Sequence, residues 1–192
     1  MRIGVVAVQG AFAEHINMLH ALDNEGLPVR LLQELTNLDA LIIPGGESTS
    51  ISQLMEVYQL TNRIVEMANQ GLPIFGTCAG MILLANNIPD SSVKPLGLMQ
   101  ITVRRNAFGR QVDSFESDLS IPILGEKPFP GVFIRAPIVE YVNSKVEVLT
   151  TLSDGTIAAA RQNQLLVTAF HPELTDDTRF HNFFLDIIKG KK

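Results

Sequence analysis

The segment PIFGTCAGMILLA, residues 73–85, carries the pattern that decides the fold. Within it, residues 76–80 have the form Gly-x-nucleophile-x-Gly, after an apolar run and before a helix-compatible one. This order predicts a strand, a sharp turn and a helix, with the Cys78 sulfur at the carboxyl edge of a parallel sheet. The helix dipole favours a thiolate there, and the Ala79 amide is free to donate to an oxyanion. The alternative is that Cys78 is only a small buried hydrophobe.

Similar apolar runs lie on both sides of this segment. A helix is expected from Phe12 to Leu22, ending near Gly26. Strands that are apolar throughout and separated by helices indicate a parallel sheet covered on both faces. Further strands of this kind are predicted over residues 3–8, 29–32, 40–43 and 165–170.

The second half of the chain has a different pattern. Between residues 100 and 161 the apolar runs are shorter and alternate with polar residues, which predicts antiparallel strands. The fold class is therefore α/β, with three layers: a mostly parallel central sheet flanked by helices, with appended antiparallel strands. We find no internal repeat and no linker, so residues 1–192 are interpreted as a single domain.

Composition narrows the classes of function. Of the 192 residues, 46% are hydrophobic and 18% are charged, as is typical of a globular protein. A net charge of −5 argues against a nucleic-acid partner, because phosphate binding requires clustered Lys and Arg. The single cysteine excludes an intramolecular disulfide and favours a reducing compartment. Since no apolar stretch approaches the ~20 residues of a membrane helix, we expect a cytoplasmic protein without a membrane partner.

A second group with catalytic character follows the last predicted buried strand. His171 and Glu173 flank Pro172, and in extended chain residues i and i+2 point to the same face. A carboxylate that holds one imidazole nitrogen leaves the other free to accept a proton from Cys78. The alternative is an ordinary surface histidine. The other three histidines are expected on partly exposed helix faces and are assigned no chemistry: His15, His20 and His181.

A glycine-rich loop, residues 44–48, also lies between an apolar strand and a helix. In parallel sheets, ligands bind in the crevice beyond the carboxyl ends of the strands. The Gly46 amide is a candidate for the second half of an oxyanion hole. The alternative is that Ser48, Thr49 or Ser50 caps the following helix. A phosphate loop is disfavoured because the chain has no Gly-Lys-Ser/Thr pattern there.

With these residues in view, the chain resembles the class I (triad) glutamine amidotransferases, whose fold is flavodoxin-like. Within them it is similar to the glutaminases of pyridoxal 5′-phosphate synthase. The resemblance covers essentially the whole chain. It rests on residues 8–10, 44–49, 76–80, 104–115, 132–137 and 170–174.

The resemblance implies a function. Cys78, His171 and Glu173 would form a triad that hydrolyses L-glutamine to glutamate and ammonia through a thioester, without a metal or other cofactor. The ammonia would pass to a synthase (lyase) subunit in a hetero-oligomer that makes pyridoxal 5′-phosphate (vitamin B6). Gln9 and Gly10 would sense that partner. The implied glutamine-binding residues are Gly46, Glu47, Ser48, Arg105, Ile134 and Arg135, although either arginine taken singly is more often ordinary surface charge.

Two other readings of the same residues stay open. DJ-1-like proteins and other cysteine hydrolases have a similar nucleophile turn on related sheets. A protein with one reactive thiol can also serve as a redox sensor without catalytic turnover. The glutamate two residues after His171 favours the amidotransferase interpretation over both.

Overall fold

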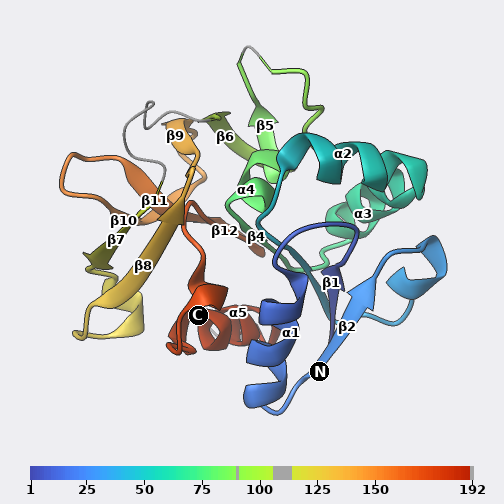
Figure 1. Cartoon of the computed structure of the whole chain (residues 1–192), viewed down its shortest axis with the longest axis horizontal. Helices are drawn as coiled ribbons and strands as arrows, with labels where there is room; N and C mark the ends of the chain where they lie inside the picture. Colours follow the sequence, from blue (N-terminus) through green and yellow to red (C-terminus); the bar gives the residue numbers. More distant parts are fainter. Residues whose placement is uncertain (90, 106–113, 191–192) are drawn as a thin grey trace.

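The computed structural model describes residues 1–89, 91–105 and 114–190, and these form three layers (Figure 1). Helices α1 (Phe12–Ala21) and α5 (Arg179–Ile188) cover one face of a central sheet. The other face is covered by α2 (Ser48–Val57), α3 (Leu60–Asn69) and α4 (Ala79–Leu84). The predicted three-layer α/β class is confirmed.

The central sheet has a parallel half and a mostly antiparallel half. Its strand order is β2-β1-β3-β4-β12-β11-β9-β6-β5, and β10 pairs with β11. The parallel half consists of β2 (Glu25–Val29), β1 (Arg2–Val6), β3 (Ala40–Ile43), β4 (Ile74–Thr77) and β12 (Leu165–Thr168). The antiparallel extension consists of β11 (Ile157–Gln162), β10 (Glu147–Thr151), β9 (Ile138–Val142) and β6 (Met99–Arg104), and the short β5 (Ala85–Asn87) runs parallel to β6.

A separate two-stranded sheet stands beside the main one. It pairs β7 (Ser114–Leu119) with β8 (Phe129–Ile134) in antiparallel register. Three short 3-10 helices complete the described elements: η1 (Leu32–Leu35), η2 (Pro122–Leu124) and η3 (Pro172–Leu174). The antiparallel strands predicted from the alternating second half are therefore present, both in the main sheet and in this hairpin.

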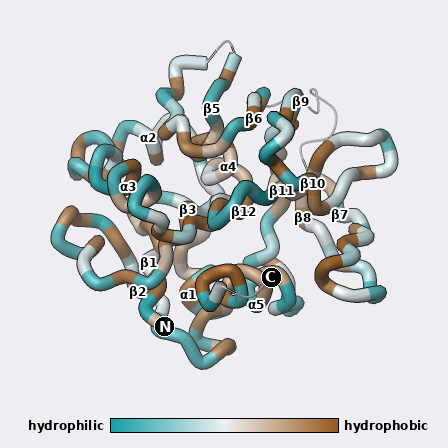
Figure 2. The backbone as a smooth tube through the Cα atoms, turned by 180° about the vertical axis from the view of Figure 1, so that it is seen from behind, coloured by the Kyte–Doolittle hydropathy of each residue, from teal (hydrophilic) through white to brown (hydrophobic). Residues whose placement is uncertain are grey.

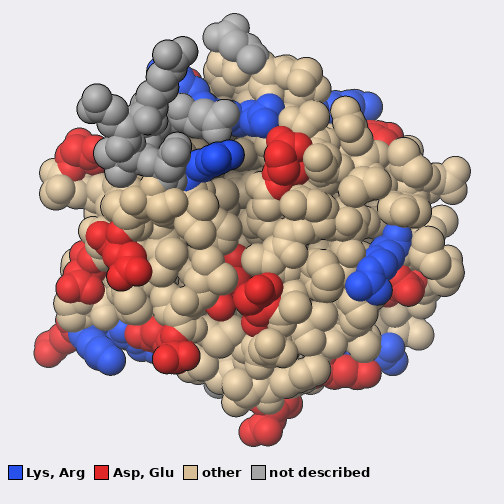
Figure 3. All heavy atoms as spheres, in the orientation of Figure 1, with Lys and Arg blue, Asp and Glu red and all other residues tan. Residues whose placement is uncertain are grey.

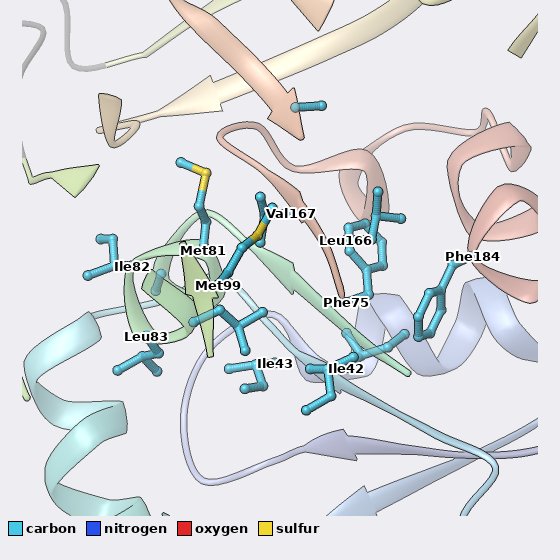
Figure 4. Packing of buried hydrophobic residues seen from close by; sticks show 14 of the residues in the cluster. Ile42, Ile43, Phe75, Met81, Ile82, Leu83, Met99, Leu166, Val167 and Phe184 are labelled. Carbon is cyan, nitrogen blue, oxygen red and sulfur yellow. The ribbon is translucent and has the colours of Figure 1, made fainter. Parts of the chain in front are cut away.

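The core lies on both faces of the parallel strands. Successive side chains of a strand point to opposite faces, so strands covered on both sides have to be apolar throughout. In Figure 4, Phe75 lies toward Phe184 of α5, whereas Ile43 lies toward Leu83 of α4. The tube in Figure 2 shows hydrophobic (brown) and hydrophilic (teal) segments alternating along the helices. Burial on both faces explains why the sequence pattern located these strands.

Two predicted boundaries near the N-terminus are wrong. The second strand spans Glu25–Val29, not residues 29–32, which lead into η1. Gly26 consequently lies inside β2 and does not end helix α1; Asp23 takes the left-handed backbone after the helix, with φ 56°. A Cβ on Gly26 would lie 3.1 Å from the Ile16 Cα, so this glycine allows β2 to pack closely on α1.

Two of the predicted buried strands are shorter than expected. The strands expected over residues 3–8 and 165–170 each end two residues earlier, where the chain turns into the loops of the candidate site. Within the described residues, no helix is long and apolar enough to cross a bilayer. Of the family-like segment 104–115, residues 106–113 lie outside the described residues.

Candidate active site

Four neighbouring parallel strands end at the same edge of the sheet. Strands β1, β3, β4 and β12 are adjacent and parallel, so the residues that follow them meet in space. The chain order also reverses there, because β1 has β2 on one side and β3 on the other. Open α/β sheets form their ligand crevice at such a switch point. The loops that contain Gln9, Gly46, Cys78 and His171 are the four that surround it.

Cys78 occupies the strained turn between β4 and α4. Its backbone has φ 48° and ψ −99°, an unfavourable conformation for a residue with a side chain. The Cys78 amide donates to the Thr168 carbonyl at 2.8 Å, which continues the β4–β12 pairing into the turn. The thiol is 6% exposed, and its Sγ lies 3.8 Å from the Ile134 carbonyl oxygen. Ala79 begins α4, so its amide has no acceptor within the helix.

The second glycine of the turn allows close packing of α4. A Cβ on Gly80 would lie 2.0 Å from the Ile43 carbonyl oxygen of β3, so only glycine permits this approach of helix and strand. Helix α4 thereby lies directly on β3 and β4, and its N-terminus is held at the sheet edge beside the thiol.

His171 and Glu173 form a buried pair. The imidazole Nδ1 lies 2.7 Å from the Glu173 Oε1, and the two residues are 6% and 5% exposed. The sequence suggested that this pair forms in extended chain, and that expectation is wrong. Pro172 starts the 3-10 helix η3, and Glu173 lies within that turn. The His171 amide also donates to the Val132 carbonyl at 2.8 Å, which ties the imidazole-bearing segment to β8.

The electrostatics of His171 favour the imidazolium. Burial lowers its pKa, but hydrogen bonds to the Cys78 sulfur and to Glu173, together with the charge of Glu173, outweigh burial and raise the pKa to about 10. Cys78 and Glu173 thus both favour the charged form of His171, and Cys78 and His171 line the same cavity. A charged imidazole next to a thiol favours the ion pair that nucleophilic cysteines use.

The glycine-rich loop makes room for this imidazole. A Cβ on Gly45 would lie 2.2 Å from the His171 Cε1, so the ring fills the space that a side chain would occupy. The Gly45 amide donates to the Thr77 hydroxyl at 3.0 Å and is not directed at a ligand. Next to it, the Gly46 amide remains the candidate oxyanion donor of this loop.

The helix after this loop is capped by Glu47, not by a serine or threonine as the alternative reading held. The Glu47 carboxylate accepts hydrogen bonds from the amides of Thr49 and Ser50, at 3.0 and 2.6 Å. Partial burial raises the pKa of Glu47, but the hydrogen bonds from Ser50 and Thr49 outweigh it and bring the pKa to about 2. Glu47 is therefore ionised at neutral pH.

Arg105 reaches the same loop from the end of β6. Its guanidinium lies 3.2 Å from the Glu47 Oε1, the Thr49 hydroxyl and the Ser91 hydroxyl. It is therefore bound to the site loop and is not an isolated surface charge. Arg135, after β8, has a left-handed backbone with φ 44°. Figure 3 shows Lys and Arg side chains gathered in the upper part of the face, near the position of β6 in Figure 1.

A cavity of about 680 Å³ opens among these elements. Most of the residues singled out from the sequence line it: Gly10, Gly46, Glu47, Ser48, Cys78, Arg105, Ile134, Arg135 and His171. Ala79, Gln9 and Glu173 do not appear in its lining. The Gln9 side-chain oxygen instead accepts from the Glu47 amide at 2.9 Å, and the Ala11 amide donates to the Gly45 carbonyl at 3.0 Å, so the loop after β1 is bound to the loop after β3.

Two histidines that the sequence placed on partly exposed faces are in fact buried. His15 of α1 and His181 of α5 are both 0% exposed, whereas His20 is exposed as expected. The His15 Nδ1 lies 2.9 Å from the His181 Nε2, and the His15 Nε2 lies 3.2 Å from the Thr77 hydroxyl. The signal was available in the spacing, because His15 precedes Leu19 by four residues and His181 precedes Phe184 by three.

Metal ligation has no support in the described part of the chain. Among those residues, no group of three or more His, Cys, Asp or Glu side chains is arranged to hold a metal ion. The His171 imidazole of the cavity pairs with the Glu173 carboxylate behind it.

Comparison with known proteins identifies the family. The model of the SNO glutamine amidotransferase family matches residues 5–189. The chain belongs to the SNO glutamine amidotransferase family. It is 55% identical to the pyridoxal 5′-phosphate synthase subunit PdxT of Dehalococcoides mccartyi over 194 aligned positions, which cover 100% of both chains. It is 56% identical to the protein of that name from Herpetosiphon aurantiacus, over 97% of this chain and 100% of the relative.

A solved structure agrees with this membership. A crystal structure described as a glutamine amidotransferase superposes with a TM-score of 0.92 at 44% identity, over 98% of this chain and 100% of the other. The family model and the solved structure both span the sheet, the turn at Cys78 and the glycine-rich loop.

Proposed function

We propose that this SNO-family protein, acting as a single domain, hydrolyses L-glutamine to L-glutamate and ammonia with Cys78 as the nucleophile. The observation that carries the proposal is that Cys78 and His171 line one cavity of about 680 Å³, with the His171 imidazole bonded to the buried Glu173 carboxylate. A nucleophile, a base and a group that orients the base are the three parts that such chemistry requires.

The reaction proceeds in two halves. The Cys78 thiolate attacks the side-chain amide carbon of glutamine, and the amides of Gly46 and Ala79 stabilise the oxyanion. His171 gives its proton to the departing nitrogen, which leaves as ammonia, and a glutamyl thioester remains on the sulfur. His171 then takes a proton from water, whose oxygen attacks the thioester and releases glutamate. Glu173 stabilises the imidazolium in both halves.

The charged groups of the cavity suit free glutamine as the substrate. Its α-carboxylate matches a guanidinium, and both Arg105 and Arg135 line the cavity. Its α-ammonium matches Glu47, which is ionised at neutral pH. Ser48 and the Ile134 backbone complete the proposed recognition, because both line the same space.

The ammonia is proposed to pass to a separate synthase subunit. The relatives from D. mccartyi and H. aurantiacus are named as subunits of pyridoxal 5′-phosphate synthase, which supports a hetero-oligomer that makes this vitamin B6 compound. Gln9 and Gly10 are proposed to report the partner's arrival, since Gln9 holds the Glu47 amide beside the oxyanion donor. The single cysteine supports a cytoplasmic location.

Replacement of Cys78 by alanine tests the proposal. We expect Cys78→Ala to lower ammonia release from glutamine by at least about a thousandfold, because the thioester cannot form. The variant should unfold at about the same temperature as the unchanged protein, since alanine keeps the Cβ and only the small thiol is removed. Ammonia should be measured with and without the co-purified synthase subunit, which we expect to stimulate release.

The same assay separates the rival readings. A DJ-1-like hydrolase would turn over peptides or thioesters and not glutamine, and a redox sensor would react once with peroxide without turnover. Undiminished ammonia release by Cys78→Ala would exclude Cys78 as the nucleophile.

A further inference from the structure

The triad carboxylate has a second oxygen that the proposed mechanism does not use. Glu173 Oε1 is bonded to His171, but Oε2 is buried and has no hydrogen-bond partner among the described residues. The His15 Nε2 lies 3.4 Å from this Oε2 atom, and both side chains are completely buried. A buried carboxylate oxygen without a donor is costly, so the identity of the atom facing it matters.

His15 is held in place from both sides. Its Nε2 lies between the Thr77 hydroxyl, at 3.2 Å, and Glu173 Oε2, while its Nδ1 lies 2.9 Å from His181 Nε2. The ring of Phe75 packs against both histidines, with centroids 6.1 and 6.0 Å away. The pair thus links α1, α5 and the end of β4 to the carboxylate in η3.

Counting protons selects one tautomer. A carboxylate only accepts hydrogen bonds, so an unprotonated Nε2 on His15 would set two lone pairs against each other. With the proton on Nε2, the N–H donates to the Thr77 hydroxyl at 3.2 Å, and its positive end faces Glu173 Oε2 at 3.4 Å. The His15 Nδ1 is then an acceptor, which requires His181 to donate from Nε2. This is the tautomer that sets no lone pair of His15 against the carboxylate oxygen.

We propose that His15 is a positioning residue, fixed in its Nε2–H tautomer by His181, which orients the Glu173 carboxylate toward His171. The proposal rests on the proposed triad chemistry and adds a residue to it. Because the donor is neutral, it fixes the carboxylate and leaves its negative charge available to the imidazolium of His171. Burial, followed by the charges of His181 and His171, holds the pKa of His15 well below its usual value, in agreement with a neutral ring.

The tautomer can be read directly. In protein labelled with ¹⁵N-histidine, two-bond nitrogen–proton correlations distinguish Nε2–H from Nδ1–H for each of the four histidines. We expect His15 to be neutral with the proton on Nε2 at pH 7. A proton on Nδ1 would overturn the proposal, and the measurement needs neither substrate nor a variant.

Substitutions test the consequence for the reaction. His15→Leu removes the donor and keeps the bulk, so we expect kcat for glutamine to fall about tenfold with KM changed less than about twofold. His15→Gln retains an N–H at the position of Nε2 and should recover kcat to within about threefold of the unchanged protein. His20→Leu, an exposed site on the same helix, is the matched control and should have no effect.

A readout without glutamine separates this proposal from the proposed function. Iodoacetamide alkylates the single cysteine, and its rate at pH 7 follows the thiolate that the His171–Glu173 pair supports. The rate should fall about tenfold in His15→Leu and recover in His15→Gln. Equal rates in the folded Leu variant and the unchanged protein, or a Gln variant as slow as Leu, would overturn the role of His15. Failure of the unchanged protein to hydrolyse glutamine would count against the proposed function instead.

Discussion

The two helical layers that cover the sheet differ in what they bury. The layer of α2, α3 and α4 buries almost only apolar side chains, such as Ile51, Leu60 and Ile64. The layer of α1 and α5 buries His15 and His181 together with its apolar side chains, and His15, bonded to His181, contacts Thr77 and Glu173 behind the candidate site. One layer packs on the sheet through apolar side chains, whereas the other also buries a polar pair that extends to the site.

This difference follows from where the site groups point. Cys78 and the glycine-rich loop face the cavity, but Glu173 turns into the interior on the α1 and α5 side. A buried carboxylate requires donors, so that layer has to contain polar side chains at positions that would otherwise be apolar. The opposite layer meets the site at the N-termini of its helices, where Glu47 caps α2 and Cys78 precedes α4.

The largest effect is expected in the polar layer. Glu173→Gln removes the charge that stabilises the His171 imidazolium and permits the wrong imidazole tautomer, so glutamine turnover should fall by about a thousandfold. Steady-state ammonia release measures this, and circular dichroism checks the fold. Glu14→Gln, the same change on exposed α1 surface, is the control. A loss smaller than about threefold would mean that the buried carboxylate does not serve the reaction.

The apolar layer should respond in stability and not in chemistry. Ile64 of α3 is 0% exposed, and Ile64→Ala should lower the free energy of unfolding by about 2–5 kcal/mol through lost burial and a cavity. Urea unfolding measures this, and kcat per folded molecule should stay within about twofold of the unchanged protein. Val57→Ala, at a site 71% exposed on α2, should change neither. A large fall in kcat for Ile64→Ala would contradict the view that this layer affects stability and not chemistry.

The smallest effect concerns the rim, where Glu47 caps α2. Its folded-state pKa of about 2 lies below the ordinary 4.5, so its stabilising contribution is present above about pH 4.5 and is lost as pH falls through 2. Glu47→Ala should cost about 1 kcal/mol or less at pH 7, because the carboxylate is half exposed and screened by water. Thermal unfolding between pH 7 and pH 2 should show the difference shrinking. A constant difference would rule out the cap as its source.

The sequence predicted correctly the strands whose side chains are buried on both faces of the sheet. The strands β1, β3, β4 and β12 were located because both faces of each are covered, and the turn around Cys78 was located by its paired glycines. Strand β2 was misplaced because Gly26 resembles a helix stop, although its role is close packing on α1. A lone glycine gives the same signal for a cap and for a tight contact, so only the fold distinguishes them.

The candidate site was predicted in part for a similar reason. Residues that follow strands converge by topology, and most of those singled out line one cavity. The burial of His15 and His181 was not predicted, because the polarity of a histidine on a helix usually indicates an exposed position. Their spacing from Leu19 and Phe184 indicates a buried face, but the contact of His15 with Glu173, 158 residues away in the chain, is contained in no local pattern.

The space that Gly45 leaves for the His171 ring has a consequence for the shape of the crevice. The ring rests on bare main chain, and the neighbouring loop after β1 is fastened to the same peptide through the Ala11 amide. The spacing between the His171 ring and the loops after β1 and β3 is thus set by the positions of the strands and by peptide geometry. A change of side-chain rotamer cannot alter this spacing, so the position of the main chain under the imidazole is fixed before a ligand binds.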